Sequence, residues 1–197
     1  PQAGRQRQFN QIGVEVIGDA SPSVDAQLIT LALRIYRMLG LRNVSLQLNS
    51  VGDKEDRKAY HKALVEYLNE HKKDLGEVDQ GRLETNPLRV LDSKDPSTKC
   101  VVAGAPQILN YLSEESKAHF NAVIEYLDKV GVEYVLNPQL VRGLDYYTHT
   151  VFEFYGEREG AQSSLGGGGR YNDLVKELGG TQTPAAGFGI GVERVIL

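Results

Sequence analysis

The chain has 197 residues and a formal net charge of -4, and 41% of its residues are hydrophobic. This length is enough for one good core, or for one core with a small appended lobe. The net negative charge argues against a protein that coats nucleic acid nonspecifically, because such binding needs many cations to neutralise phosphates. A structured RNA could still dock on a local patch.

The sequence contains no run of about 18 apolar residues that could span a membrane. Its first residues are polar and basic, and no hydrophobic stretch leads to a cleavage site, so we see no signal peptide. We therefore expect a cytoplasmic protein without a membrane partner. Cys100 is the single cysteine, which excludes an internal disulfide and a CxxC metal or redox site.

Residues 9–17 alternate in character, which predicts a strand with one polar face. Ile12, Val14 and Val16 fall on one face, and Gln11, Gly13 and Glu15 fall on the other. The glycine between two hydrogen-bonding side chains leaves room for a ligand against the sheet. Without further context, these polar residues would more often form the solvent side of an edge strand.

A helix is predicted next, capped by Ser21 or Ser23 and ending at Gly40. Residues 44–48 then indicate another strand. From residue 53 the sequence changes to charged segments with apolar residues at helical spacing, at 54–73 and again at 114–130. Residues 76–106 between them look irregular. We interpret 53–135 as a mainly helical insertion lobe, whose interleaved charges indicate a solvated face.

Strand patterns return at 133–136, 147–155, 163–168 and 186–190. These strands flank a helical block and show no βαβ alternation. The fold class predicted is therefore α+β, with a mainly antiparallel sheet flanked by helices.

The segment RGLDYYTHTVFE, residues 142–153, groups a fixed cation, an acid, two phenols and a histidine just before an aromatic strand. Arg142 lies where a strand breaks into a turn, and its forked guanidinium suits a phosphate or a carboxylate. Taken alone, it would more often be a surface arginine. Neighbours in a strand face opposite ways, so we expect one phenol of the Tyr146–Tyr147 pair to reach a ligand and favour Tyr147. We expect His149 to be structural.

Two glycine-rich segments follow. Residues 166–169 could be a linker by composition, but glycines directly before RYNDLVKEL also let a backbone approach a ligand. Gly187, Gly189 and Gly191 do not have the spacing of a dinucleotide fingerprint, and no P-loop triplet occurs.

Four segments, in this order, closely resemble those of histidyl-tRNA synthetases. They are GRQRQFNQIGVEVIG, RGLDYYT followed by TVFE, GGGGRYNDLV and GFGIGVERVIL. The resemblance implies a class II synthetase catalytic core at 1–52 and 136–197, with 53–135 inserted. It also implies that the core is incomplete, because motif 1 and the first strand of motif 2 are absent. We accordingly expect this chain alone to be weakly active or inactive.

The resemblance further implies roles for individual residues. Arg142 would be catalytic, through the α-phosphate. Histidine would be bound by Gln11, Glu15, Tyr146, Tyr147 and Tyr171. ATP would be bound by Arg5, Arg7, Gln11, Arg142, Gly189 and Arg194, with Mg2+ as cofactor and no protein metal ligands assigned.

The function implied is activation of histidine with ATP and its transfer to tRNA(His), by a protein that is a homodimer. The alternative is the synthetase-like regulatory subunit of ATP phosphoribosyltransferase, a noncatalytic histidine-binding protein of the same fold. That paralogue tends to lose RGLDYYT and the ATP-contacting arginines. Arg142, Tyr147 and Arg194 are present here, which favours the enzyme. A structural fragment without a ligand is a third possibility, against which the grouping of glycines and polar residues argues.

Overall fold

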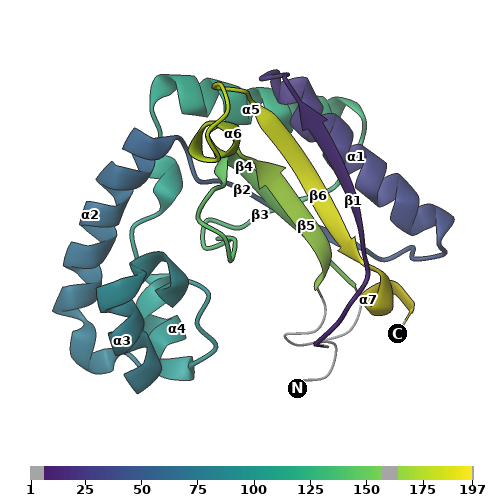
Figure 1. The fold of residues 1–197 in the computed structure, drawn as a ribbon. Coiled ribbons are helices and arrows are strands. Elements are labelled where there is room, and N and C mark those ends of the chain that lie inside the picture. Colours follow the sequence, from purple (N-terminus) through teal and green to yellow (C-terminus); the bar gives the residue numbers. More distant parts are fainter. Residues whose placement is uncertain (1–6, 157–163, 197) are drawn as a thin grey trace.

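A computed structural model describes residues 7–156 and 164–196, and within them the chain forms one six-stranded sheet (Figure 1). The strand order is β1-β6-β5-β4-β2-β3, and all neighbours are antiparallel except β2 and β3. The strands are β1 (Gln11–Ile17), β2 (Ser45–Ser50), β3 (Val135–Leu136), β4 (Thr148–Tyr155), β5 (Ser164–Arg170) and β6 (Ala185–Gly191). The predicted mainly antiparallel α+β fold is confirmed.

Two long helices, α1 (Pro22–Met38) and α5 (Glu114–Lys129), pack together against one face of the sheet (Figure 1). The helix α1 begins after Ser21, whose hydroxyl accepts a hydrogen bond from the Ser23 amide at 3.3 Å. Gly40, just past the helix, has a φ of 89°, which glycine adopts without strain. The main core contains side chains from both helices and from the sheet, including Ile29, Tyr36, Leu48, Val123, Phe152, Phe154 and Phe188.

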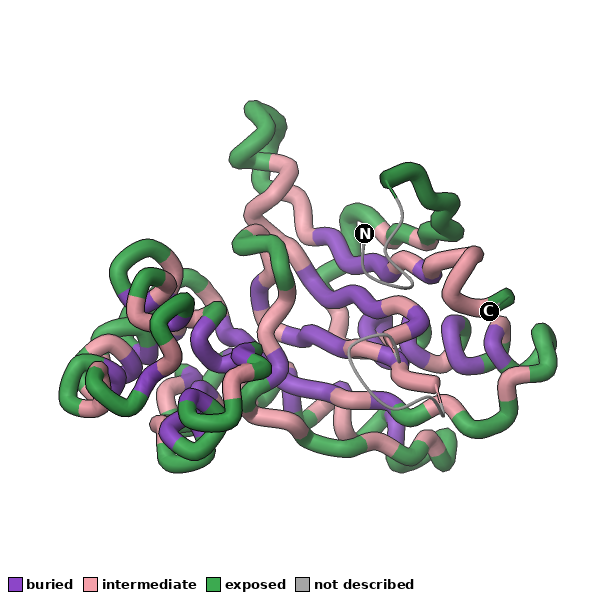
Figure 2. Tube along the Cα trace, turned by 90° about the horizontal axis from the view of Figure 1, so that it is seen from below, coloured by how far each residue is buried: buried purple, intermediate pink, exposed green. Residues whose placement is uncertain are grey.

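A helical lobe stands beside the sheet, on the left in Figure 1. It contains α2 (Lys54–Glu70), α3 (Glu77–Thr85) and α4 (Pro96–Ala103), with short 3-10 helices η1 (Lys72–Asp74), η2 (Pro87–Val90) and η3 (Ile108–Tyr111). The lobe has its own core, built around Tyr60, Leu64, Leu83 and Val102. Buried segments run both through the central strands and inside the lobe (Figure 2).

The expectation that residues 76–106 are irregular is wrong, because α3 and α4 lie in this range. The pattern in α3 is weak: Leu83 is its only buried hydrophobic residue, and Gly81 interrupts it. The helix α4 spans only 8 residues. An N-terminal cap stabilises this helix: the Asp95 carboxylate accepts hydrogen bonds from the amides of Ser97 and Thr98 at 2.9 and 3.0 Å.

The inserted lobe was expected to continue to residue 135, a range that includes α5. Phe120, Val123 and Leu127 of α5 belong to the main core, in contact with α1. We therefore propose that the lobe ends near residue 112. Two short helices, α6 (Leu174–Glu177) and α7 (Val192–Ile196), follow β5 and β6. Among the described residues, no helix has the length and apolar character needed to cross a membrane.

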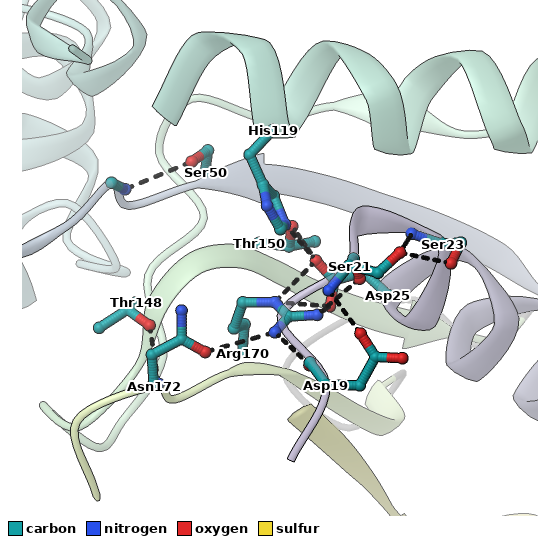
Figure 3. Close-up of polar contacts among 11 residues, drawn as sticks. Asp19, Ser21, Ser23, Asp25, Ser50, His119, Thr148, Thr150, Arg170 and Asn172 are labelled. Atoms are coloured by element: carbon teal, nitrogen blue, oxygen red, sulfur yellow. Dashed lines mark hydrogen bonds and ion pairs between the residues drawn. The ribbon is translucent and has the colours of Figure 1, made fainter. Parts of the chain in front are cut away.

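A buried ion pair joins α1 to the end of β5 (Figure 3). Asp25 and Arg170 are 1% and 0% exposed, and Nη2 of Arg170 lies 2.8 Å from Oδ1 of Asp25. The other carboxylate oxygen, Oδ2, accepts a hydrogen bond from Thr150 of β4 at 2.8 Å and lies 2.7 Å from Nε2 of His119 of α5. Arg170 also donates to the carbonyl oxygens of Asp19 and Ser21, both at 3.0 Å. The pair therefore connects two helices and two strands.

Replacing Arg170 with methionine should destabilise the chain by about 3–5 kcal/mol, because the carboxylate of Asp25 would remain buried without its cation. Urea unfolding followed by circular dichroism measures this loss. The double variant Arg170→Met with Asp25→Asn should lose less, since it leaves no buried unpaired charge. A loss below about 1 kcal/mol for Arg170→Met alone would contradict this view of the pair.

Candidate functional site

A cleft of about 1050 Å3 opens on the face of the sheet opposite α1 and α5. Its lining comes from β1, β4, β5, β6, α6, α7 and the 141–147 loop, which precedes β4. Val14 and Val16 pack against the main core, so the alternation of β1 turns Gln11, Gly13 and Glu15 toward the cleft. The polar face predicted from the sequence therefore lines a cleft.

Glycines of β6 make space for the polar side chains of β1. Glu15 pairs with Gly187 across the two strands, and a Cβ added to Gly187 would overlap the Glu15 carboxylate. A Cβ at Gly189 would likewise overlap the amide of Gln11. The two side chains thus lie across the backbone of β6, and partial burial raises the pKa of Glu15 above its ordinary value.

Three tyrosine rings form a cluster in the cleft. The ring centroids of Tyr146 and Tyr147 are 4.6 Å apart, and Tyr171 lies 5.6 and 6.2 Å from them in edge-on contacts. Both Tyr146 and Tyr147 line the cleft, because they precede β4, which begins at Thr148, and strand alternation does not apply to them. Burial raises the pKa of Tyr146, and its hydrogen bond with Tyr147 raises it further.

Arg142 lines the same cleft as Glu15 and forms an ion pair with Glu153. Nη1 of Arg142 is 3.4 Å from Oε1 of Glu153, and its guanidinium is 5.8 Å from the ring centroid of Tyr147. Glu153 in turn accepts hydrogen bonds from the hydroxyls of Tyr155, at 2.9 Å, and Ser164. A Cβ at Gly167 would come within 2.7 Å of Nη1 of Arg142, so this glycine admits the guanidinium.

Glu153 was not among the residues singled out from the sequence, although a signal for it exists. Phe152 and Phe154 pack in the main core, so the residue between them must face the cleft. Asp25 and the anchoring role of Arg170 were also missed. A charged pair separated by 145 residues leaves no local pattern in a sequence.

The remaining predicted ATP ligands differ in their placement. Arg194 of α7 lines the cleft and donates to the carbonyl oxygen of Ser164 at 2.5 Å. Arg7 is exposed and lies outside the cleft lining, whereas Arg5 falls outside the described residues. His149 is also outside the lining; its ring is 5.1 Å from that of His119, and burial lowers its pKa.

Comparison with known proteins decides the family. The model of the histidyl-tRNA synthetase family matches residues 1–195. The chain belongs to the histidyl-tRNA synthetase family.

Individual relatives of this family are similar over the whole chain. A histidine–tRNA ligase of Picosynechococcus sp. is 56% identical over 197 residues, which are 100% of this chain and 46% of the relative. The structure of apo S. aureus histidyl-tRNA synthetase is 41% identical with a TM-score of 0.74, covering 96% of this chain and 46% of that one. The chain therefore spans about half the length of such relatives, and the likeness confirms the predicted class II synthetase fold.

A third match comes from Bacillus halodurans and is described as an ATP phosphoribosyltransferase regulatory subunit/histidyl-tRNA synthetase. It is 27% identical with a TM-score of 0.63, and the match covers 95% of this chain and 52% of that one. Its double description names both functions that the sequence had suggested. The higher identity to histidine–tRNA ligases favours the synthetase.

Replacing Glu15 with glutamine should leave the chain equally stable or slightly more stable near pH 7. Because its pKa is raised, the carboxyl of Glu15 binds a proton more tightly in the folded chain than in the unfolded chain. The protonated carboxyl therefore stabilises the folded chain fully below the ordinary pKa of glutamate, and this stabilisation is lost as pH rises through the raised pKa. The gain should stay below about 1 kcal/mol, because the side chain is largely exposed. Urea midpoints near pH 7 and near pH 4 measure it, and a gain that grew toward acid would contradict this assignment.

Proposed function

We propose that the chain is the histidine-activating part of a histidine–tRNA ligase. The longer enzyme would join histidine to ATP, giving histidyl-adenylate and pyrophosphate, and then transfer the histidyl group to the 3' end of tRNA(His). The observation that carries this proposal is that Glu15, the tyrosine cluster and Arg142 all line one cleft. The name histidine–tRNA ligase of relatives at 56% identity supports it.

The histidine site is proposed at the end of the cleft where Glu15 meets the tyrosines. A neutral imidazole offers one donor and one acceptor, so a carboxylate and a phenol can read both of its nitrogens. Glu15 would accept from the ring N–H, and Tyr147 would address the other nitrogen. Gln11 would hold the α-amino end, while Tyr146 and Tyr171 close the pocket. An amino acid without these ring atoms would leave the polar groups of the site unpaired.

The ATP site is proposed along β6 and α7. Adenine would lie against the strand at Gly189, with Arg194 beside it, and Arg5 and Arg7 would meet the distal phosphates. No group of three or more His, Cys, Asp or Glu able to hold a metal ion occurs among the described residues. Mg2+ is commonly bound through substrate phosphates and few carboxylates, so it would arrive with ATP.

Arg142 would act on the α-phosphate. The histidine carboxylate oxygen forms a bond to the α-phosphorus while the bond to pyrophosphate breaks, and negative charge spreads over the phosphoryl oxygens. A guanidinium already held by Glu153 meets this charge without reorganising, which is where electrostatic catalysis is most effective. By the family resemblance alone, the longer enzyme would be a cytoplasmic homodimer.

Replacing Arg142 with glutamine should reduce histidine-dependent ATP–pyrophosphate exchange about 100- to 1000-fold. Histidine affinity, measured by calorimetry, should change little because the guanidinium serves the phosphate. The exchange is measured on this chain and on a form extended to the length of its relatives. Tight histidine binding without exchange in the extended wild-type form would favour the regulatory-subunit function instead.

Replacing Glu15 with glutamine should weaken histidine binding about 10- to 100-fold, the value of one hydrogen bond to a charged group. Calorimetric titration with histidine measures this loss. Glu125→Gln is the matched control, because it removes an exposed carboxylate of α5 that lies 3.8 Å from Nζ of Lys129. Equal affinities in the two variants would remove Glu15 from the proposed histidine site.

A further inference from the structure

A second cleft, of about 390 Å3, lies between the helical lobe and the 141–147 loop. Arg142, Leu144 and Tyr147 line this cleft as well as the larger one, so the loop separates the two. The lobe side of the second cleft is basic. Its cationic and titratable side chains are Lys54, Arg57, Lys58, His61 and Arg89.

Two of these cations contact the backbone of the loop. Nη1 of Arg57, in α2, donates to the carbonyl oxygen of Asp145 at 2.8 Å. Nη2 of Arg89, in η2, donates to the carbonyl oxygen of Gly143 at 2.6 Å. A third and longer contact joins Nδ2 of Asn86 to the carboxylate of Asp145 at 3.5 Å. The lobe thus holds the loop at two peptide groups that follow Arg142 and precede Tyr146.

The hydrogen bonds from Arg57 and Arg89 can fix the position of the loop backbone. Residues 141–147 belong to neither a helix nor a strand, so no ladder of backbone hydrogen bonds fixes them. Guanidinium groups remain charged and donate strong hydrogen bonds to carbonyl oxygens. Nε of Arg57 is shielded from solvent, while Nη1 of the same guanidinium reaches the loop at the exposed edge of the cleft.

We propose that Arg57 and Arg89 are positioning residues, which hold the 141–147 loop so that Arg142 and Tyr147 face the substrate cleft. This inference rests on the proposed function for its consequence, since the side chains being positioned are those assigned to histidine and ATP. It gives the lobe a direct role in the site: the lobe would set the geometry of the loop from the side away from the substrates.

Lys58 supplies a matched control. It lines the same cleft and carries the same charge, but its Nζ pairs with Glu55 of its own helix, at 4.0 Å. Replacing Lys58 with methionine lowers the positive charge of the cleft without removing a contact to the loop. Any effect shared by Lys58→Met and the arginine variants would therefore come from charge and not from anchoring.

The test is limited trypsin digestion of the ligand-free chain, in which mass spectrometry follows cleavage of the bond between Arg142 and Gly143. Native-state proteolysis reports how often a segment opens. Arg57→Met and Arg89→Met should each speed this cleavage about tenfold, a value typical of one hydrogen bond to a charged group. Lys58→Met should leave the rate unchanged, and Arg57→Lys should restore much of the protection, because a lysine can still donate to one carbonyl oxygen.

A second measurement separates positioning from general stability. Histidine affinity should fall about tenfold in Arg57→Met and Arg89→Met, while their urea midpoints match that of Lys58→Met. If Arg57→Met lowers the urea midpoint, the Arg89→Met variant alone tests the positioning role. Arg89 is exposed, so its replacement should not lower the stability of the chain. Unchanged cleavage in both arginine variants, or equal acceleration in Lys58→Met, overturns the proposal. Because the digestion needs no ligand, a wild-type form extended to the length of its relatives that fails to bind histidine would count against the proposed function and leave the anchoring result to stand by itself.

Discussion

Asp25 and Arg170 hold together the parts of the chain from which the cleft is built. The carboxylate comes from the first turns of α1, and the guanidinium comes from the last residue of β5. Removing both charges from water is costly, and the cost is met only because hydrogen bonds from Thr150 and to the carbonyls of Asp19 and Ser21 complete the network. Arg170 immediately precedes Tyr171, so a fully buried side chain fixes the backbone from which a cleft tyrosine extends.

The site on the opposite face depends on small residues as much as on functional ones. Glu15 and Gln11 can lie flat on the sheet only because their cross-strand neighbours in β6 lack side chains. Gly167 has the same relation to Arg142. The glycines therefore have a positive role in the site: each opens the space that one polar side chain occupies, at the cost of the conformational entropy that glycine loses on folding.

The sheet could be predicted from the sequence because its strands alternate clearly, as β1 does with Val14 and Val16 inward and Glu15 outward. The helices α3 and α4 could not, since they are short and stabilised by lobe packing and by the Asp95 cap rather than by a strong apolar stripe. The same limit applies to α5, whose amphipathic pattern predicts a helix but not which core it joins. Strand alternation could not separate Tyr146 from Tyr147, because both residues precede β4. Arg57 was placed on a solvated face, since the loop it contacts lies 88 residues away in sequence.

The 141–147 loop separates two clefts, and its residues Arg142, Leu144 and Tyr147 line both of them. A small molecule bound in the lobe-side cleft would therefore touch side chains that also line the larger cleft, without entering the space proposed for histidine and ATP. If the loop positions the proposed histidine site, such a molecule and histidine would each weaken the binding of the other without sharing space. An anionic group on such a compound would compete with the Gly143 and Asp145 carbonyls for Arg57 and Arg89, and the compound would act by releasing the loop.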